Sequence, residues 1–293
     1  MSSLSSWSPA LVIMIGALLV PFLRGTLRNV YMLALPIAAF ALFVTMPDGD
    51  HGAFAYLGVE IVPIRIDGWT RLFGYIFLLA TLISVIYALH VRDWIQQVAG
   101  LVYAGGAIGA VLAGDYLTLF VFWEVTAIAS VFLVWASRTE RSYRSGIRYV
   151  TVQLLSGVLL LMGGLVLYSE SGSLRFENVG LNGVGGWLIF IAMGIKCAFP
   201  LMHNWLQDAY PEATETGTVF LSAFTTKLAI YALARGFAGT EELIWIGAVM
   251  TAFPIFYAVI ENDLRRVLAY SLNNQLGFMV VGIGIGTELA LNG

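Results

Sequence analysis

Ten long runs of apolar residues, separated by short polar segments, dominate the chain. The hydrocarbon core of a bilayer is about 30 Å thick and takes about 20 residues of helix to cross, so each run predicts a membrane-spanning helix. The runs lie at 8–23, 29–46, 69–90, 95–113, 115–136, 145–168, 186–210, 216–236, 242–260 and 264–287. The pattern therefore predicts an all-α fold, a polytopic transmembrane bundle of about ten helices.

One run contains a residue that interrupts helices. Pro200 lies inside 186–210. Proline has no backbone N–H, and its ring crowds the carbonyl group four residues earlier, which here belongs to Lys196. The sequence therefore predicts a broken helix near Lys196–Pro200. Broken helices at membrane depth are tolerated where they line a wet cavity or are buried in protein.

The segment 47–68, between the second and third runs, has a different pattern. Apolar residues alternate with polar ones over Val59–Ile66, as in a strand with one covered face. Two interpretations remain for this loop, a short exposed hairpin and an irregular connection.

Composition agrees with the apolar pattern and excludes other classes of protein. Apolar residues make up 59% of the 293 residues and charged residues 11%, against roughly 45–50% and about 25% in soluble domains. A soluble enzyme needs more charge, and a net charge of −3 does not suit nucleic-acid binding. The sequence has no phosphate-binding glycine loop and no metal-binding cluster of His and Cys. We therefore expect no cofactor and no metal.

The arginines predict how the chain lies in the membrane. With the N-terminus outside, nine arginines fall in inward loops and four at the outward side, which follows the positive-inside rule. The polar start of the chain has no basic n-region, so no cleaved signal peptide is expected. The inward set is Arg24, Arg28, Arg92, Arg138, Arg141, Arg144, Arg148, Arg265 and Arg266, and the outward set is Arg65, Arg71, Arg175 and Arg235.

Three charged residues lie inside the apolar runs. Glu124, Lys196 and Lys227 each follow the start of a predicted helix by nine to eleven residues, roughly 13–16 Å at 1.5 Å per residue. A charge at that depth costs a few kcal/mol, and opposite charges at one level can offset each other's loss of water. The sequence favours an ion path through these residues. The alternative is a structural ion pair that pins helices together.

Further polar residues accompany these charges. His203 follows Lys196 by seven residues and titrates near neutral pH, and Ser222 and Thr226 share a stripe of the predicted helix with Lys227. These residues either extend the path as proton relays or form ordinary hydrogen bonds between helices. The candidate relays are His203, Ser222, Thr226, Asn274 and Gln275, the last two beside Asn273 in the final run.

Four segments, taken in order, resemble a known family. They are GDYLTLFVFWE (114–124), GIKCAFPLMHNWLQDAYPEA (194–213), SAFTTKLAIYALAR (222–235) and NDLRRVLAYSLNNQLGFMVVGIGIG (262–286). They are similar to the proton-translocating antiporter-like family, which comprises large subunits of Mrp-type cation/proton antiporters and membrane-arm subunits of complex I and related hydrogenases. The last segment is most similar to the D subunit of the Mrp type.

The resemblance implies roles for the three membrane charges. Glu124 matches the family's glutamate of the fifth helix, Lys196 the lysine of the broken seventh helix, and Lys227 the lysine of the eighth. In the family the glutamate modulates the lysine's affinity for protons, which move along a central hydrated axis. Several complex I members have histidine where this chain has Gln275, which favours the Mrp type.

The resemblance also implies a division of the chain. Three N-terminal helices (1–93) precede a first five-helix repeat (94–240), and 241–293 begin a second, inverted repeat. Because family members complete both repeats, we expect either a fragment or a separate polypeptide that supplies the rest.

Together these features predict a proton-translocating subunit of a multisubunit Na⁺/H⁺ antiporter in the bacterial cell membrane, a transporter and not an enzyme. Its expected partners are other membrane subunits, lipid, protons and sodium. The alternative is a proton-pumping membrane subunit of a complex I-like NADH dehydrogenase or a membrane-bound hydrogenase. A scaffold with buried ion pairs and no transport is a third hypothesis.

Overall fold

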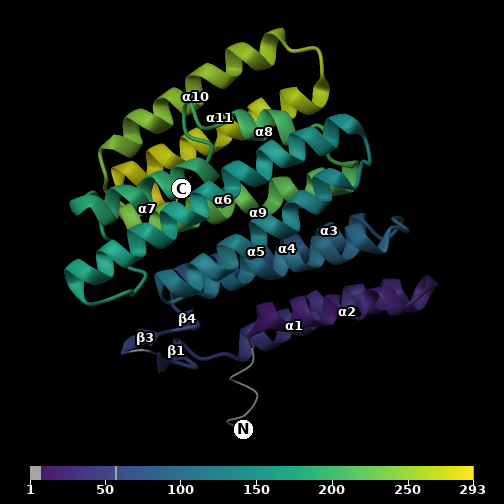
Figure 1. Ribbon diagram of the computed structural model, residues 1–293, viewed down its shortest axis with the longest axis horizontal. Coiled ribbons are helices and arrows are strands. Elements are labelled where there is room, and N and C mark those ends of the chain that lie inside the picture. Colours follow the sequence, from purple (N-terminus) through teal and green to yellow (C-terminus); the bar gives the residue numbers. More distant parts are fainter. Residues whose placement is uncertain (1–7, 57, 293) are drawn as a thin grey trace.

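The chain folds as a bundle of helices that lie side by side, from α1 and α2 at one edge to α10 and α11 at the other (Figure 1). The computed structural model describes residues 8–56 and 58–292. The longer helices are α1 (Pro9–Ala17), α2 (Gly25–Thr45), α3 (Gly68–Tyr87), α4 (Trp94–Leu112), α5 (Tyr116–Trp135), α6 (Glu140–Ser171), α7 (Gly183–Lys196), α9 (Glu215–Phe237), α10 (Glu242–Ile260) and α11 (Leu264–Ile285). The short ones are η1 (Val20–Phe22), α8 (Asn204–Ala209) and α12 (Glu288–Asn292).

Within the described ranges, seven helices are long and apolar enough to cross a membrane: α2, α3, α4, α5, α6, α9 and α10. This confirms the prediction of a polytopic helical membrane protein. The first predicted run divides into α1 and η1, and the seventh into α7 and α8. The expectation of no cleaved signal peptide concerns the start of the chain, and residues 1–7 lie outside the described part.

α6 begins five residues earlier than the apolar pattern predicts. Thr139 and Ser142 form a capping box, in which the Thr139 hydroxyl accepts the Ser142 N–H at 3.0 Å and the Ser142 hydroxyl accepts the Thr139 N–H at 3.1 Å. Capping satisfies backbone donors that the first turn leaves free. The helix therefore extends into a polar segment that hydropathy alone assigns to a loop.

The loop at 47–68 is a hairpin. Its strands are β1 (Gly49–His51), β2 (Phe54–Tyr56), β3 (Val59–Ile61) and β4 (Ile64–Ile66). β1 pairs with β4 and β2 with β3, both antiparallel, with Gly49 opposite Ile66 and Phe54 opposite Ile61. The structure therefore decides between the two interpretations of this loop. We call the side of the bundle that carries it the hairpin end.

The predicted break is present. α7 ends at Lys196 and α8 begins at Asn204. Between them Ala198 and Leu201 have φ angles of 60° and 70°, a left-handed conformation that a continuing helix does not contain. The indole N–H of Trp205 donates to the Ile195 carbonyl oxygen at 2.9 Å. This bond adds a side-chain donor across the break to a carbonyl group that also accepts the Ala198 N–H at 3.1 Å.

Three of the arginines that the sequence predicts on the inward side form ion pairs at the opposite end of the bundle. Arg138 pairs with Asp93 at 2.8 Å, Arg141 with Glu212 at 2.9 Å and Arg148 with Asp208 at 2.6 Å. We call this side the arginine end. The division into 1–93, 94–240 and 241–293 stays a prediction.

Candidate functional site

Lys196 is held at the end of α7, and no carboxylate among the described residues bonds to it. Its side chain is fully buried, at 0% exposure. The ammonium donates to the Trp123 carbonyl oxygen at 2.7 Å and to the Thr126 hydroxyl at 2.9 Å, and it lies 4.3 Å from the centroid of the Trp123 ring. A cation above a tryptophan face is attracted by the ring quadrupole. α5 therefore supplies a carbonyl, a hydroxyl and an aromatic face to one lysine.

Glu124 follows Trp123 on α5, so its position in the chain brings it near the lysine site. Its Oε1 atom is buried and has no hydrogen-bond partner among the described residues. Gly157 of α6 makes the room for this carboxyl group, because a Cβ at Gly157 would overlap Oε1. A buried acceptor without a partner is costly, which marks Glu124 as a group with unused hydrogen-bonding capacity.

Glu124 and Lys196 act on each other electrostatically, but they do not form an ion pair in the described part of the chain. The sequence left a structural ion pair between helices as the alternative to an ion path. The structure instead gives the lysine neutral partners on Trp123 and Thr126 and leaves the carboxylate beside it. This arrangement lacks the direct contact that a purely structural ion pair requires.

Lys227 lies on α9 and faces a cavity. Its ammonium donates to the Ser222 carbonyl oxygen at 2.8 Å. The cavity measures about 500 Å³ and is lined by Ser222, Lys227 and Gln275, with Glu215 and Arg265 where α9 and α11 begin. Every α9 residue on this wall precedes Lys227 or is Lys227 itself. The cavity therefore runs from Lys227 toward the arginine end.

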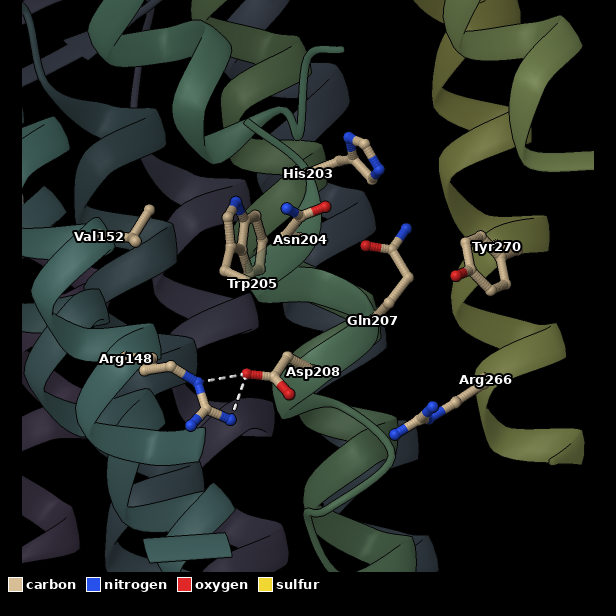
Figure 2. Close-up of a pocket in the computed structure, with 9 residues that line it drawn as sticks. All are labelled: Arg148, Val152, His203, Asn204, Trp205, Gln207, Asp208, Arg266 and Tyr270. Atoms are coloured by element: carbon tan, nitrogen blue, oxygen red, sulfur yellow. Dashed lines mark hydrogen bonds and ion pairs between the residues drawn. The ribbon is translucent and has the colours of Figure 1, made fainter. Parts of the chain in front are cut away.

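A second cavity, of about 430 Å³, lies between α6, α8 and α11 (Figure 2). His203 lines it together with Gln207, and the Arg148–Asp208 pair forms one wall opposite Arg266. The His203 Nδ1 atom and both amide atoms of Gln207 are buried without partners within the described residues. His203 contacts Phe253, with ring centroids 4.6 Å apart, and no hydrogen bond in the described part joins it to either lysine.

The remaining candidate relays have three different kinds of surroundings. Ser222 and Gln275 share the cavity with Lys227. Asn274 instead donates to the Thr251 carbonyl oxygen of α10 at 2.6 Å, as a residue that joins two helices does. The Thr226 hydroxyl and the Asn273 amide are buried without partners in the described ranges.

The sequence reasoning missed Trp123, Thr126 and Gly157. Trp123 and Thr126 lie three residues apart and therefore on one face of a helix. Trp123 directly precedes Glu124 in the chain, and Thr126 follows Glu124 by two residues. That spacing is a signal that could have found them. Gly157 lies on another helix, and no local pattern links it to Glu124.

A family model for the transmembrane domain described as NADH:quinone oxidoreductase/Mrp antiporter matches residues 113–293. The D subunit of the Na⁺/H⁺ antiporter of Alkalihalophilus pseudofirmus is 31% identical over 208 residues, which cover 64% of this chain and 42% of that protein. The N subunit of the NADH-quinone oxidoreductase of Desulforudis audaxviator is 30% identical, over 97% of this chain and 64% of that protein. The chain thus spans less than two thirds of the length of either relative.

The fold is also similar to that of a solved structure. A chain of the membrane-bound sulfane sulfur reductase, an archaeal respiratory membrane complex, superposes with a TM-score of 0.82 at 21% identity. The match covers 96% of this chain and 65% of the other. At this identity the likeness concerns the arrangement of helices.

Proposed function

We propose that this chain, which belongs to the NADH:quinone oxidoreductase/Mrp antiporter transmembrane family, is a proton-translocating subunit of a multisubunit Na⁺/H⁺ antiporter. Protons move through Glu124, Lys196 and Lys227, and sodium is exchanged by the assembled complex. The 31% identity to the D subunit of an Na⁺/H⁺ antiporter supports this choice within the family.

One observation carries the proposal: within the described part of the chain, the buried Lys196 ammonium and a Glu124 oxygen that has no hydrogen-bond partner lie in one site without forming an ion pair. Burial favours the neutral amine, and an approaching carboxylate favours the ammonium form. The position of Glu124 therefore controls whether Lys196 holds or releases its proton. A pair already bonded to each other would lack this freedom.

Lys196 and Lys227 have different roles in the proposed path. Lys227 faces the cavity that leads to the arginine end, so its ammonium exchanges protons with that side. Lys196, held by Trp123 and Thr126, stores a proton away from the cavity. A proton that leaves Lys196 converts that ammonium to an amine, and the next acceptor on the path gains the charge.

The proposal also covers the membrane, the orientation and the partners of the chain. We place it in the bacterial cell membrane with its N-terminus outside, so that the arginine end faces the cytoplasm. Its partners are further membrane subunits, a proposal supported by relatives that are themselves named as subunits of an antiporter and of an oxidoreductase.

Replacement of Lys196 tests the proposal. In vesicles that contain the assembled complex, Lys196→Ala and Glu124→Gln should each abolish the pH change that added Na⁺ produces, because the first removes the proton carrier and the second removes the charge that controls it. Fluorescence of a pH-sensitive dye reports the exchange, and immunodetection reports assembly.

Cys197→Ala is the matched control. Cys197 adjoins Lys196, is equally buried and carries no charge in the path. It should retain Na⁺-linked exchange close to that of the unmodified complex. Normal exchange by an assembled Lys196→Ala variant would exclude this lysine as a carrier.

A second candidate function rests on the match to the N subunit of an NADH-quinone oxidoreductase, which extends over 97% of this chain. In that case the chain is a proton-pumping membrane subunit of a redox-linked complex. Purification of the native assembly decides between the two. Flavin and iron–sulfur absorbance in the purified complex would support the redox-linked function, and their absence together with Na⁺-linked exchange would support the antiporter.

A further inference from the structure

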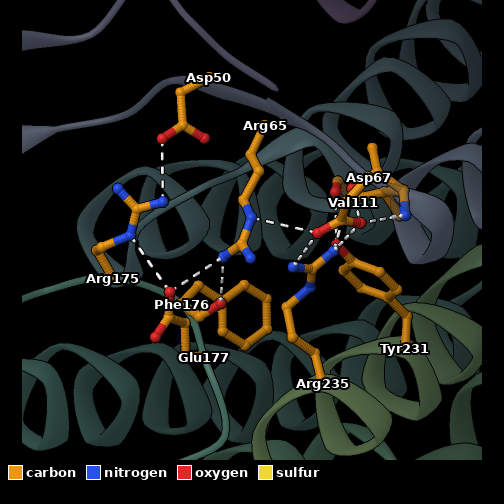
Figure 3. A network of polar contacts seen from close by, with 10 residues as sticks. Asp50, Arg65, Asp67, Val111, Arg175, Phe176, Glu177, Tyr231 and Arg235 are labelled. Carbon is orange, nitrogen blue, oxygen red and sulfur yellow. Dashed lines mark hydrogen bonds and ion pairs between the residues drawn. The ribbon is translucent and has the colours of Figure 1, made fainter. Parts of the chain in front are cut away.

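Six charged residues of alternating sign cross the hairpin end of the bundle (Figure 3). They come from three segments far apart in the chain, namely the hairpin with its following residue, the loop between α6 and α7, and the last turn of α9. In order they are Asp50, Arg175, Glu177, Arg65, Asp67 and Arg235, with successive N···O distances of 3.0, 3.3, 3.7, 3.2 and 2.8 Å.

The Arg235 end of this chain of charges is the buried one. The Arg235 side chain is 5% exposed, whereas Asp50 at the other end is 31% exposed. Two guanidinium nitrogens of Arg235 donate to the two oxygens of Asp67, both at 2.8 Å, and one also donates to Thr70 at 3.1 Å. A planar, two-bond pair fixes orientation as well as distance.

Aromatic rings surround the same guanidinium. Its central carbon lies 5.2 Å from the Tyr231 ring centroid and 5.5 Å from that of Phe176. Tyr231 is fully buried, donates to the Val111 carbonyl oxygen at 2.7 Å and packs against Phe73 at 5.1 Å between centroids. The region around Arg235 is therefore filled.

Lys227, Tyr231 and Arg235 follow each other at intervals of four residues on α9. Residues four apart lie one turn above each other on nearly the same side of a helix. The two turns between Lys227 and the hairpin end thus carry a buried tyrosine and a buried arginine. On the other side, Lys227 lines the cavity of about 500 Å³ that runs toward the arginine end. Among the described residues, neither Tyr231 nor Arg235 lines this cavity, so it extends from Lys227 toward the arginine end only.

We propose that Asp67 and Arg235 are positioning residues that lock α9 to the start of α3, so that Tyr231 and Arg235 close the path between Lys227 and the hairpin end. This inference rests on the proposed function, since a closed end matters only where ions move. The lock joins the helix that carries Lys227 to the segment that follows the hairpin. Opening requires α9 and α3 to separate at this end.

The lock is not a pH switch. Partial burial by itself raises the pKa of the Asp67 carboxyl, but hydrogen bonds from Arg235 and Thr70 and the Arg235 charge outweigh it and lower the pKa to about 2. Asp67 therefore stays ionised at physiological pH, and the lock is released by movement of the helices.

Passive proton permeability tests the lock. The assembled complex is reconstituted into vesicles without Na⁺, and the decay of an imposed pH gradient is recorded with a trapped dye. Asp67→Asn should raise the decay rate about tenfold. This corresponds to an open state whose free energy, relative to the closed state, is about 1.4 kcal/mol lower than in the unmodified complex. Arg235→Lys keeps the charge but loses the planar two-bond contact, and it should give a smaller increase.

Asp50→Asn is the matched control, because it breaks the exposed end of the same chain of charges. Vesicles with this variant should be as tight as those with the unmodified complex. Tight vesicles for both Asp67→Asn and Arg235→Lys, or an equal leak for Asp50→Asn, would overturn the lock. If the unmodified complex shows no Na⁺-linked exchange, the proposed function is rejected. The two outcomes are distinguishable, because the leak is measured without Na⁺ and does not depend on exchange.

Discussion

At the scale of single residues, the site depends on which atoms surround one buried lysine. Lys196 contacts a main-chain carbonyl, a hydroxyl and an indole face. Each of these partners is neutral, so the ammonium is stabilised without a fixed counter-charge. A neutral setting lets the nearby carboxylate change the lysine's charge by a small movement.

Gly157 determines whether that carboxylate has room, and Gly157→Ala should therefore reduce exchange. A Cβ at this position would overlap the Glu124 Oε1 atom, so the side chain must move from its place. We expect Na⁺-linked exchange in vesicles to fall about tenfold, as when about 1.4 kcal/mol of transition-state stabilisation is lost.

Gly164→Ala on the same helix is the control for that substitution. The nearest atom to a Cβ at Gly164 is 3.4 Å away, an ordinary contact, and this variant should exchange normally. Equal activity of the two variants would mean that the place of Glu124 is not critical.

At the scale of elements, the break between α7 and α8 has more than one cause. Pro200 disfavours a continuous helix. Ala198 and Leu201 hold the left-handed turns, and Trp205 bonds back to Ile195 across the break. α7 therefore ends with its charged residue at the interior of the bundle, where α5 can bind it.

Trp205→Phe should destabilise this break. The substitution removes the indole hydrogen bond to the Ile195 carbonyl oxygen, which still accepts the Ala198 N–H at 3.1 Å. A hydrogen bond of this kind contributes about 0.5–1.5 kcal/mol. We expect a lower thermal unfolding temperature for the purified protein in detergent. Trp187→Phe changes an exposed tryptophan of α7, at 45% exposure, and should leave that temperature unchanged. Identical shifts for both would show that the bond across the break contributes nothing.

At the scale of the whole molecule, the two ends of the bundle differ. Both cavities that contain candidate relays lie toward the arginine end. The hairpin end is crossed by the alternating charges. Under the proposed function, this difference between the two ends leaves Lys227 accessible from the arginine end while the path toward the hairpin end is closed.

The pKa of Asp67 predicts how the stability of the whole protein varies with pH. Because this pKa is lowered to about 2 in the folded protein from its ordinary 3.8, the stabilisation that the ionised Asp67 contributes is fully present above about pH 5. It is lost as the pH falls from about 4 to about 2. Unfolding temperatures of the unmodified protein and of Asp67→Asn should differ by a constant amount above pH 5 and converge below pH 4. A difference that persists unchanged to pH 2 would contradict this pKa.

The sequence by itself determined the membrane helices and the break near Pro200, and it predicted the depth of Glu124, Lys196 and Lys227. Hydropathy, a missing backbone N–H and the rise of a helix are local properties, so a single segment of the chain contains them. The family followed from spaced motifs that carry these same residues. How the chain lies across the membrane and which residues conduct protons remain predictions.

Only the tertiary structure decided what each charge touches. The sequence counted Arg235 as one of four arginines at the outward side, and the fold buries it against Asp67, 168 residues away in the chain. Trp123 and Gly157 entered the site for the same reason, since packing of α5 against α6 and α7 brings them to Glu124 and Lys196. A pattern along one helix records which side is apolar, whereas the partner of a buried charge depends on a second helix that the pattern does not contain.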